Sequence, residues 1–321
     1  MTEFELIQRF FAGDRAKGEV ALGIGDDCAL IRWSPSDYLA ISTDSQVEGR
    51  HFPARYPAAC VATRALGAAT SDLAAMGAMP MGCLLALTLP KPDPEWVKGF
   101  SDAFKACADK WQIPLLGGDT TAGPLQVTVT VLGRVSAKEA LLRSGASVGD
   151  DLWVSGRLGD AAGALKFRQA EPDQAFDELP QGPVASLVAR YDRPEPRLSL
   201  GIWLLGKATA AIDISDGLVA DVGHICDRSG LGAEIRLESL PVSDALSQVY
   251  PASEIETFAL YGGDDYELCF SAPAHLRTQL EQAPFSLTRI GHMTTGGGVQ
   301  LSRGGKLFPP TGSGFDHFRG Q

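Results

Sequence analysis

Hydrophobic and polar residues recur with two different periods along this chain. In residues 94–111, Phe100 and Phe104 share one face at helical spacing and a proline stands first, which predicts an amphipathic helix. Residues 126–135 alternate valine with mostly polar residues, which predicts a strand with one buried face. Both periods are found in each half of the chain, so the pattern indicates an α/β protein.

The same criteria predict the remaining elements. Helices are predicted over residues 3–11, 57–76, 159–167, 196–207 and from Leu218 onward. Strands are predicted over residues 28–31, 38–42, 83–89, 113–116, 151–155, 208–214 and 266–270. Residues 171–183 are polar and rich in proline and predict a loop, and the glycines at 296–298 predict a hairpin turn.

A small, polar and basic segment, residues 136–149, interrupts the pattern near the middle of the chain. The length of 321 residues accommodates about two domains of roughly 150 residues each. We therefore predict an N-terminal α/β domain over residues 1–136 and a C-terminal α/β domain over residues 149–321.

Composition narrows the classes of partner and of site. The net charge of -11 argues against binding to nucleic acid or to an anionic membrane. We expect no signal peptide and no membrane span, since no basic segment leads into an apolar run and no run reaches roughly 18 apolar residues. The six cysteines include no C-x-x-C pair, which argues against zinc and disulfides and favours a cytoplasmic protein.

Acidic residues gather among glycine, serine and threonine at several points. Solvated acidic faces usually mix Asp and Glu with Lys and Arg, whereas these clusters are nearly all Asp. The clusters are Gly25-Asp26-Asp27, Ser42-Thr43-Asp44, Ser71-Asp72, Gly117-Gly118-Asp119, Asp213-Ile214-Ser215-Asp216-Gly217 and Gly262-Gly263-Asp264-Asp265. Short carboxylates on tight turns can converge on a hard cation such as Mg²⁺, which takes oxygen ligands. Such a cation would let an acidic protein bind a phosphorylated substrate.

The most specific cluster is residues 213–217, which follow an apolar strand and precede a helix. Ser215 or Asp216 could cap that helix. A cap needs one such residue, whereas three polar residues stand here at i, i+2 and i+3, so binding of metal and phosphate is favoured. An EF-hand is excluded, because the sixth position counted from Asp213 is not glycine and the twelfth is His224.

Other clusters keep two interpretations. Asp27 and residues 42–44 fit ordinary turns when each is taken alone. Asp72 lies in an alanine-rich helix that is predicted to be buried, where a carboxylate must be a metal ligand or have a structural partner. Residues 117–119 fit a hairpin turn, or a backbone that a ligand approaches closely because glycine has no Cβ.

Single residues and one apparent motif are also ambiguous. Residues 201–207 have the spacing of a P-loop, but the bulky apolar interior and Ala208 after the lysine exclude it, so any ATP site lacks a P-loop. His51 could be a core histidine or a substrate contact. Arg143 could be a solvated charge or a phosphate clamp. Phe315 could belong to a packed tail or stack on a flat ring ligand.

Taken in order, these stretches resemble the thiamine-monophosphate kinase family, within the larger aminoimidazole-ribonucleotide-synthetase-like superfamily. The matching stretches are Gly23–Leu30, Ile41–Phe52, Ser71–Ala78, Gly117–Thr121, Arg143–Ala146, Asp213–Leu218 and Tyr261–Leu268. Each stretch is weak by itself, but the ordered set spans nearly the whole chain and is highly specific.

The resemblance implies a fold, an activity and an assembly. The fold is that of the two-domain superfamily, an α/β (α+β) architecture with mixed sheets and packed helices in each domain. The activity is the ATP-dependent phosphorylation of thiamine monophosphate to thiamine diphosphate, in thiamine diphosphate biosynthesis, with several Mg²⁺ ions. The assembly is a homodimer built through the N-terminal domains.

Residue roles follow from motif position. The implied Mg²⁺ ligands are Asp27, Ser42, Thr43, Asp44, Asp72, Asp119, Asp213 and Asp216, of which Asp119, Asp213 and Asp216 are expected to matter most for catalysis. The implied ATP contacts are Gly118, Asp119, Arg143 and Ser215. The implied substrate contacts are His51, Asp264 and Phe315. One position departs from the pattern, because the family often carries Glu where this chain has Asp264, and the shorter side chain reaches less far.

The implied reaction suits a site rich in Asp and poor in His. The acceptor is a phosphate with a second pKa near 6, so it is largely ionised at neutral pH and needs no general base. Metal and positioning would bring the two polyanions together, and we expect direct in-line transfer without a phosphoenzyme.

Other proteins of the superfamily and a different class remain as alternatives. A selenophosphate-synthetase-like chain would carry a reactive Cys before Gly25, where this chain has none. Aminoimidazole ribonucleotide synthetase is harder to exclude by chemistry, but the stretch from Ser42 to Phe52 favours the thiamine enzyme. A protein that binds a nucleotide with Mg²⁺ and has no catalytic activity is the alternative from another class.

Overall fold

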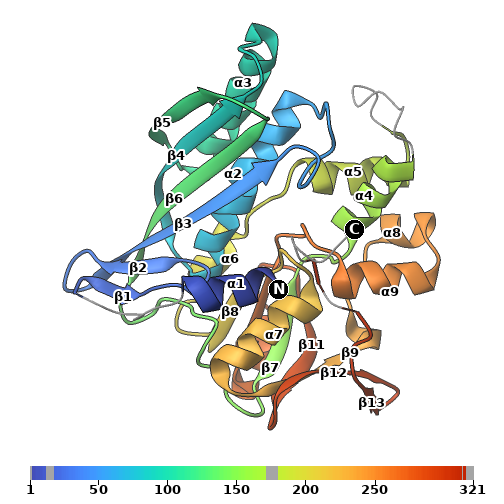
Figure 1. Ribbon diagram of the computed structural model, residues 1–321. Coiled ribbons are helices and arrows are strands. Elements are labelled where there is room, and N and C mark those ends of the chain that lie inside the picture. Colours follow the sequence, from blue (N-terminus) through green and yellow to red (C-terminus); the bar gives the residue numbers. More distant parts are fainter. Residues whose placement is uncertain (1, 12–17, 171–179, 313, 316–321) are drawn as a thin grey trace.

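The computed structural model describes residues 2–11, 18–170, 180–312 and 314–315. Two mixed sheets occupy different halves of this described structure, and helices pack around and between them (Figure 1). Residues 171–179 of the predicted loop lie outside the described ranges.

The N-terminal sheet has six strands within the described residues, in the order β1-β2-β3-β6-β4-β5. Their bounds are β1 Val20–Leu22, β2 Ala29–Arg32, β3 Asp37–Val47, β4 Met79–Leu89, β5 Leu115–Ala122 and β6 Gln126–Ser136. The long strands β3, β6 and β4 pair antiparallel and form its centre, whereas β5 pairs in parallel with β4 at one edge.

The burial of side chains in strand β6 agrees with the alternation in its sequence. Val127, Val129 and Val131 are fully buried, and the threonines between them are half-buried on the other face. The valine face packs against helix α2 (Ala58–Ala75), and α3 (Pro94–Trp111) packs on α2 in turn. Burial of one face therefore fixes both the register of β6 and the place of α2.

The C-terminal sheet has seven described strands in the order β13-β12-β9-β11-β7-β10-β8. Their bounds are β7 Asp151–Ser155, β8 Ala210–Asp213, β9 Gly232–Arg236, β10 Leu268–Ala272, β11 Leu287–Thr294, β12 Gly298–Arg303 and β13 Lys306–Phe308. Strands β9 and β12 pair in parallel, and the other neighbours pair antiparallel.

Among the remaining helices, α7 lies over the second sheet, and α4, α5, α8 and α9 form a group to one side of it (Figure 1). Their bounds are α1 Glu3–Phe10, α4 Asp160–Ala170, α5 Pro183–Asp192, α6 Leu198–Leu204, α7 Leu218–Ser229, α8 Asp244–Val249, α9 Ala252–Tyr261 and α10 Arg277–Glu281. Helix α7 packs on β8, β9 and β12, while α4 and α8 both pack on α5. None of the helices in the described ranges is both long and apolar enough to cross a membrane.

Helix α2 is the element that joins the two halves. It packs on β3 and β6 of the first sheet and on α5, α6 and β8 of the second half. The small alanine side chains of α2 let α6 approach closely. Gly201 of α6 is needed at this contact, because a Cβ there would lie 1.9 Å from the carbonyl oxygen of Ala74. The glycine that seemed to begin a P-loop is thus needed for helix packing, and the helix predicted over residues 196–207 is confirmed as the shorter α6.

Two predicted boundaries are wrong in a way that matters for the site. The strand predicted over residues 38–42 continues to Val47, so Asp44 lies within β3 rather than at its end. The strand predicted over residues 113–116 continues as β5 through Gly117–Asp119, so no turn occurs there. Gly118 is required because its φ is 154° and a Cβ would lie 1.8 Å from the carbonyl oxygen of Leu85. The backbone that approaches Gly118 is therefore that of β4.

The predicted hairpin at residues 296–298 is also wrong. Strands β11 and β12 lie on either side of that turn, but both pair with β9 and do not pair with each other. Alternation within each strand cannot reveal that a third strand, distant in sequence, inserts between two consecutive ones. The hydrophobic pattern also gave no prediction of β1, β9, β11, β12, β13, α5, α8, α9 and α10.

Candidate active site

Three carboxylates from distant parts of the chain meet between the two halves of the molecule. Asp27 precedes β2, Asp72 lies in α2 and Asp213 ends β8. One oxygen from each lies within 4.8 Å of the others. The structure therefore brings together three of the predicted metal ligands, and we call them the carboxylate cluster.

The electrostatics of the carboxylate cluster favour a bound cation or proton. Burial, followed by the negative charge of Asp27, raises the pKa of Asp213 to about 7. Burial, followed by the charges of Asp213 and Asp27, raises the pKa of Asp72 well above its ordinary value. Burial also raises the pKa of the nearby Asp216 to about 7. The cluster therefore holds more negative charge than its surroundings neutralise.

The donor set fits a hard divalent cation. The Asp27 side chain has no solvent exposure, and its Oδ2 atom has no hydrogen-bond partner among the described residues. A buried carboxylate oxygen without a partner is unfavourable, and a cation at that atom would satisfy it. Carboxylate oxygens at this spacing suit Mg²⁺, and Asp27, Asp72 and Asp213 are the residues that could hold it.

Arg143 provides the positive charge on one side of the cluster. Its Nη2 and Nε atoms lie 2.7 and 3.3 Å from Oδ1 of Asp27, and its side chain is only 18% exposed. Its backbone N–H donates to both oxygens of Asp26 at 3.2 Å. The interpretation of Arg143 as a solvated charge is therefore wrong. The guanidinium instead stands beside the carboxylates.

Strand β3 supplies residues to both of its faces. Ser42 faces α2, and its hydroxyl donates to Oδ2 of Asp72 at 2.5 Å. Asp44 lies two residues further along the same face and accepts from Nε2 of Gln46 at 3.2 Å. Thr43 points to the opposite face, where its hydroxyl pairs with that of Thr130 at 2.9 Å. Ser42 and Asp44 thus lie on the side of the carboxylate cluster, while the side chain of Thr43 does not.

The loop of residues 213–217 is held by a residue that the sequence analysis did not single out. Oδ2 of Asp221 accepts from the backbone N–H groups of Ser215, Asp216 and Gly217 at 3.2, 3.2 and 3.1 Å. The N-cap of α7 is Gly217, and no side chain caps the helix there. Capping by Ser215 or Asp216 is therefore excluded, which leaves both side chains for other roles.

Gly118 and Asp119 lie apart from the carboxylate cluster. Asp119 is exposed on the edge strand β5, and the order β3-β6-β4-β5 puts it three strand spacings, or about 14 Å, from β3. The register aligns Asp119 with Ala86, Thr128 and Ser45, which lie on the face opposite to Ser42 and Asp44. Within one protomer, the structure does not bring these two residues to the other predicted ligands.

The three predicted substrate contacts lie around one edge of the cluster. Asp264 donates its backbone N–H to the carbonyl of Ser215, and Phe315 donates its own to the carbonyl of Asp216, both at 2.9 Å. The ring of Phe315 is 45% exposed, and the guanidinium of Arg50 lies 5.6 Å from its centre. His51 follows Arg50 directly. The structure therefore gathers His51, Asp264 and Phe315 beside the loop of residues 213–217.

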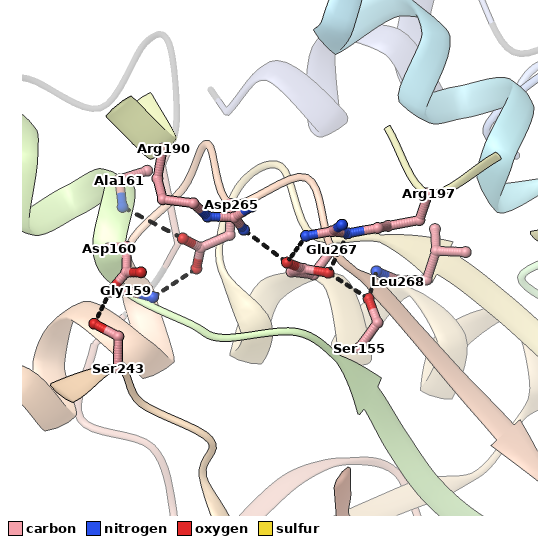
Figure 2. A network of polar contacts seen from close by, with 10 residues as sticks. All are labelled: Ser155, Gly159, Asp160, Ala161, Arg190, Arg197, Ser243, Asp265, Glu267 and Leu268. Atoms are coloured by element: carbon pink, nitrogen blue, oxygen red, sulfur yellow. Dashed lines mark hydrogen bonds and ion pairs between the residues drawn. The ribbon is translucent and has the colours of Figure 1, made fainter. Parts of the chain in front are cut away.

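The two acidic residues that follow Asp264 have partners from the protein itself. Figure 2 shows Asp265 accepting from the backbone N–H groups of Gly159 and Ala161, at the start of α4. It also shows Glu267 between Arg190 and Arg197, at 2.6 and 2.5 Å. A third donor, the hydroxyl of Ser155, lies 2.5 Å from Glu267. These donors satisfy both carboxylates, so we assign Asp265 and Glu267 to the structure rather than to ligand binding.

Comparison with known proteins identifies the family of this chain. Residues 25–135 match the family model of the N-terminal domain of AIR synthase related proteins, and residues 147–303 match the model of the C-terminal domain. A thiamine-monophosphate kinase from Escherichia coli (strain K12) is 43% identical over 326 residues, which cover 98% of each chain. The chain belongs to the thiamine-monophosphate kinase family.

Solved structures of this family have the same fold. The crystal structure of thiamine-monophosphate kinase from Stenotrophomonas maltophilia K279a is 43% identical, with a TM-score of 0.81, and the match covers 95% of this chain and 97% of that one. A structure of AaThiL complexed with AMPPCP and TMP is 30% identical, with a TM-score of 0.85, and covers 99% of this chain and 97% of that one. The family and the fold class predicted from the sequence are thus confirmed.

Several residues of the site gave little or no signal in the sequence. Asp221 offered one weak sign, since acidic residues are favoured in the first turn of a helix. Asp26 stood next to Asp27 but had no separate role in the motif analysis. Arg64 lies inside an alanine-rich helix, where nothing in the local pattern indicates which segments from other parts of the chain will contact it.

Proposed function

We propose that this protein transfers the γ-phosphoryl group of ATP to the phosphate of thiamine monophosphate, forming thiamine diphosphate in its biosynthesis. The observation that carries the proposal is the carboxylate cluster, in a chain that belongs to the thiamine-monophosphate kinase family. The buried Oδ2 atom of Asp27 in this cluster has no partner in the part of the chain that the structure describes. The relative that is complexed with AMPPCP, an analogue of ATP, and TMP supports the same pair of substrates.

The transfer is direct and in line. The acceptor phosphate is largely ionised at neutral pH and attacks without a general base. When bound, Mg²⁺ supplies positive charge between the two polyanionic substrates. Arg143 adds a positive charge at the same place, beside the buried carboxylates of Asp27 and Asp213.

The proposed roles follow the motif positions. The Mg²⁺ ligands are Asp27, Ser42, Asp44, Asp72, Asp119, Asp213 and Asp216, and Thr43 would contribute its backbone carbonyl oxygen, because its side chain faces the other side of the sheet. The ATP contacts are Gly118, Asp119, Arg143 and Ser215. The substrate contacts are His51, Asp264 and Phe315, with the exposed ring of Phe315 stacking on a ring of the thiamine moiety.

The enzyme acts as a homodimer, and the apolar surface of β4 and β5 supports this. Met79, Met81, Leu84, Leu115 and Leu116 are each at least 40% exposed there. A second copy of the chain would remove this surface from water and would cover the edge strand β5. Residues 118–119 lie on the same edge, so in the dimer they reach an ATP site that includes the partner protomer. This accounts for their distance from the carboxylate cluster.

Sedimentation velocity tests the dimer. Leu116→Glu introduces a charge into the proposed interface and should give monomers. Leu307→Glu is the matched control, because Leu307 is 54% exposed on β13 in the other half of the chain, and it should remain a dimer. A wild-type monomer at micromolar concentration would contradict the assembly. In this assembly, residues 1–136 form the dimerising unit and residues 149–321 complete the active site.

A coupled assay of ADP release, with thiamine diphosphate measured directly, tests the activity. Product should form with ATP, thiamine monophosphate and Mg²⁺ together, and should be lost when Mg²⁺ is removed. Binding of ATP without formation of thiamine diphosphate would favour the alternative of a nucleotide-binding protein without catalytic activity. Inversion at a chiral γ-phosphorus is expected, and net retention would exclude direct transfer.

The free state of the described cysteine thiols supports a cytoplasmic location. The described cysteines are all free, and four of them are buried, which suits the reducing cytoplasm. We therefore assign the enzyme to the cytoplasm.

A further inference from the structure

Arg64 is a charged residue inside the hydrophobic core. It lies in the middle of α2, and its side chain is only 1% exposed. A guanidinium buried to this degree is unfavourable unless acceptors surround it. The identity of its acceptors therefore indicates what the charge is for.

The Arg64 guanidinium contacts three segments that are distant in sequence. Its Nη1 atom donates to the carbonyl of Tyr191 at 2.6 Å. Its Nη2 atom lies 3.2 Å from the carbonyl oxygen of His51 and 3.0 Å from Oδ2 of Asp264. The guanidinium also lies 3.8 Å from the centre of the Tyr191 ring. One nitrogen thus bridges two of the three proposed substrate contacts.

Each of these two residues is held on its other side as well. Oδ1 of Asp264 accepts from the hydroxyl of Tyr266 at 2.9 Å, so both carboxylate oxygens are fixed. The carbonyl of His51 accepts a second bond from the hydroxyl of Tyr191 at 3.1 Å. Nδ1 of His51 accepts from the backbone N–H of Val47 at 3.0 Å, which puts the proton of the neutral ring on Nε2.

The backbone around Asp264 is strained in a way that needs such restraint. Asp264 and Tyr266 have φ angles of 68° and 49°, in the left-handed region that residues other than glycine seldom adopt. Conformations of this kind persist when the surroundings over-determine them. The ion pair with Arg64 and the hydroxyl of Tyr266 are the side-chain contacts that do so at the carboxylate.

We propose that Arg64 is a positioning residue for the thiamine monophosphate subsite, where it holds His51 of the N-terminal half and Asp264 of the C-terminal half at a fixed separation. This inference rests on the proposed function and adds a residue to it. The planar fork of a guanidinium can serve several acceptors at once, whereas a lysine ammonium on a flexible stem cannot hold the same three.

A change at Arg64 should affect the binding of the two substrates differently. Arg64 contacts His51 and Asp264 through side-chain hydrogen bonds, whereas Asp264 contacts the loop of residues 213–217 through its backbone N–H, which a change at Arg64 leaves in place. Loss of Arg64 should therefore weaken binding of thiamine monophosphate and spare ATP.

Steady-state kinetics and calorimetric binding of thiamine monophosphate to Arg64→Lys test this. The KM and Kd for thiamine monophosphate should rise by about tenfold, as expected for loss of a hydrogen bond to a charged group, with the KM for ATP changed by less than about twofold. Tyr266→Phe removes one restraint on Asp264 with little change of volume, and it should raise the same constants by about threefold. It also tests the proposal if Arg64→Lys does not fold.

Two further comparisons separate positioning from general stability. In an Asp264→Asn background, Arg64→Lys should have a much smaller effect, since the two residues act through one contact. Arg277→Lys is the control for loss of an arginine–aspartate pair outside the site, because Arg277 of α10 pairs with Asp151 of β7 at 2.9 Å, and it should change neither KM.

Three outcomes would overturn the inference: equal increases in both KM values, additive effects of Arg64→Lys and Asp264→Asn, or unchanged binding of thiamine monophosphate. Calorimetry tests the role of Arg64 in binding separately from the proposed kinase activity. A wild-type protein that binds thiamine monophosphate without phosphorylating it would refute the activity alone. A wild-type protein that does not bind it would refute both.

Discussion

Two groups of acidic residues in this protein carry the same carboxylate group in different surroundings. Glu267 is in contact with two arginines and a serine hydroxyl, and Asp265 accepts two backbone N–H groups at the start of α4 (Figure 2). In the carboxylate cluster, Arg143 and the hydroxyl of Ser42 donate to carboxylate oxygens. One buried oxygen of Asp27 has no partner among the described residues.

The comparison indicates how to separate structural carboxylates from ligand-binding ones. Burial alone does not distinguish them, since the side chains of Glu267 and Asp27 are both fully buried. The supply of donors does, because a fully buried carboxylate whose partners all come from the protein has no need of a ligand, whereas the partly exposed Asp264 can still accept from one. The group around Glu267 should therefore determine stability, and the carboxylate cluster should determine Mg²⁺ binding and turnover. The predictions below test this division.

The largest effect is expected from Asp213→Asn. The amide keeps the shape of the side chain but removes one negative charge from the cluster, so Mg²⁺ binding and thiamine diphosphate formation should both be lost. Circular dichroism should report an intact fold. Asp216→Asn should behave in the same way. Turnover near that of the wild type in a folded variant would contradict the metal role.

Glu267→Gln should have the opposite result. Both arginines would lose their charged partner in a buried site, so the free energy of unfolding should fall by about 3 kcal/mol. Urea unfolding measures this loss, and the KM for Mg²⁺ in the remaining folded protein should stay unchanged. If the KM for Mg²⁺ rose while stability did not change, the proposed division between the two groups would be wrong.

The next largest effect is expected from the pH dependence of Mg²⁺ binding, which should distinguish the carboxylate cluster from the group around Glu267. The pKa values of Asp213 and Asp216 are raised to about 7, so the folded protein without metal holds protons that the unfolded chain releases. Its stability should therefore fall as pH rises from about 4 to about 7. Burial also raises the pKa of Asp265, so this fall does not separate the two groups, whereas the effect of Mg²⁺ does. Protons compete with Mg²⁺, so the rise in Tm on adding Mg²⁺ should be larger at pH 8 than at pH 6. Scanning calorimetry measures both, and a Mg²⁺ effect equal at the two pH values would contradict the cluster as the binding site.

Much of this site could be predicted from the sequence, and the reasons for the failures are physical. Residues 213–217 and Asp72 were identified because carboxylates among small residues are unusual next to apolar elements. The place of Asp119 was missed, because strand order across a sheet depends on pairing between distant segments and local alternation does not encode it. Arg64 and Asp221 were missed for the same reason, since each acts through partners that only the tertiary fold brings near.

The smallest effects come from a matched pair of hydroxyls. Ser42 donates to Asp72 in the carboxylate cluster and Ser155 donates to Glu267, both at 2.5 Å. Ser155 also accepts from the backbone N–H of Leu268 at 2.9 Å, so Ser155→Ala should lower the free energy of unfolding by about 1–2 kcal/mol with no change in the KM for Mg²⁺. Ser42→Ala should raise the KM for Mg²⁺ by several-fold, with less than about half that loss of stability. Because the same atom is removed in each case, a similar result for both variants would mean that donor supply does not separate the two groups.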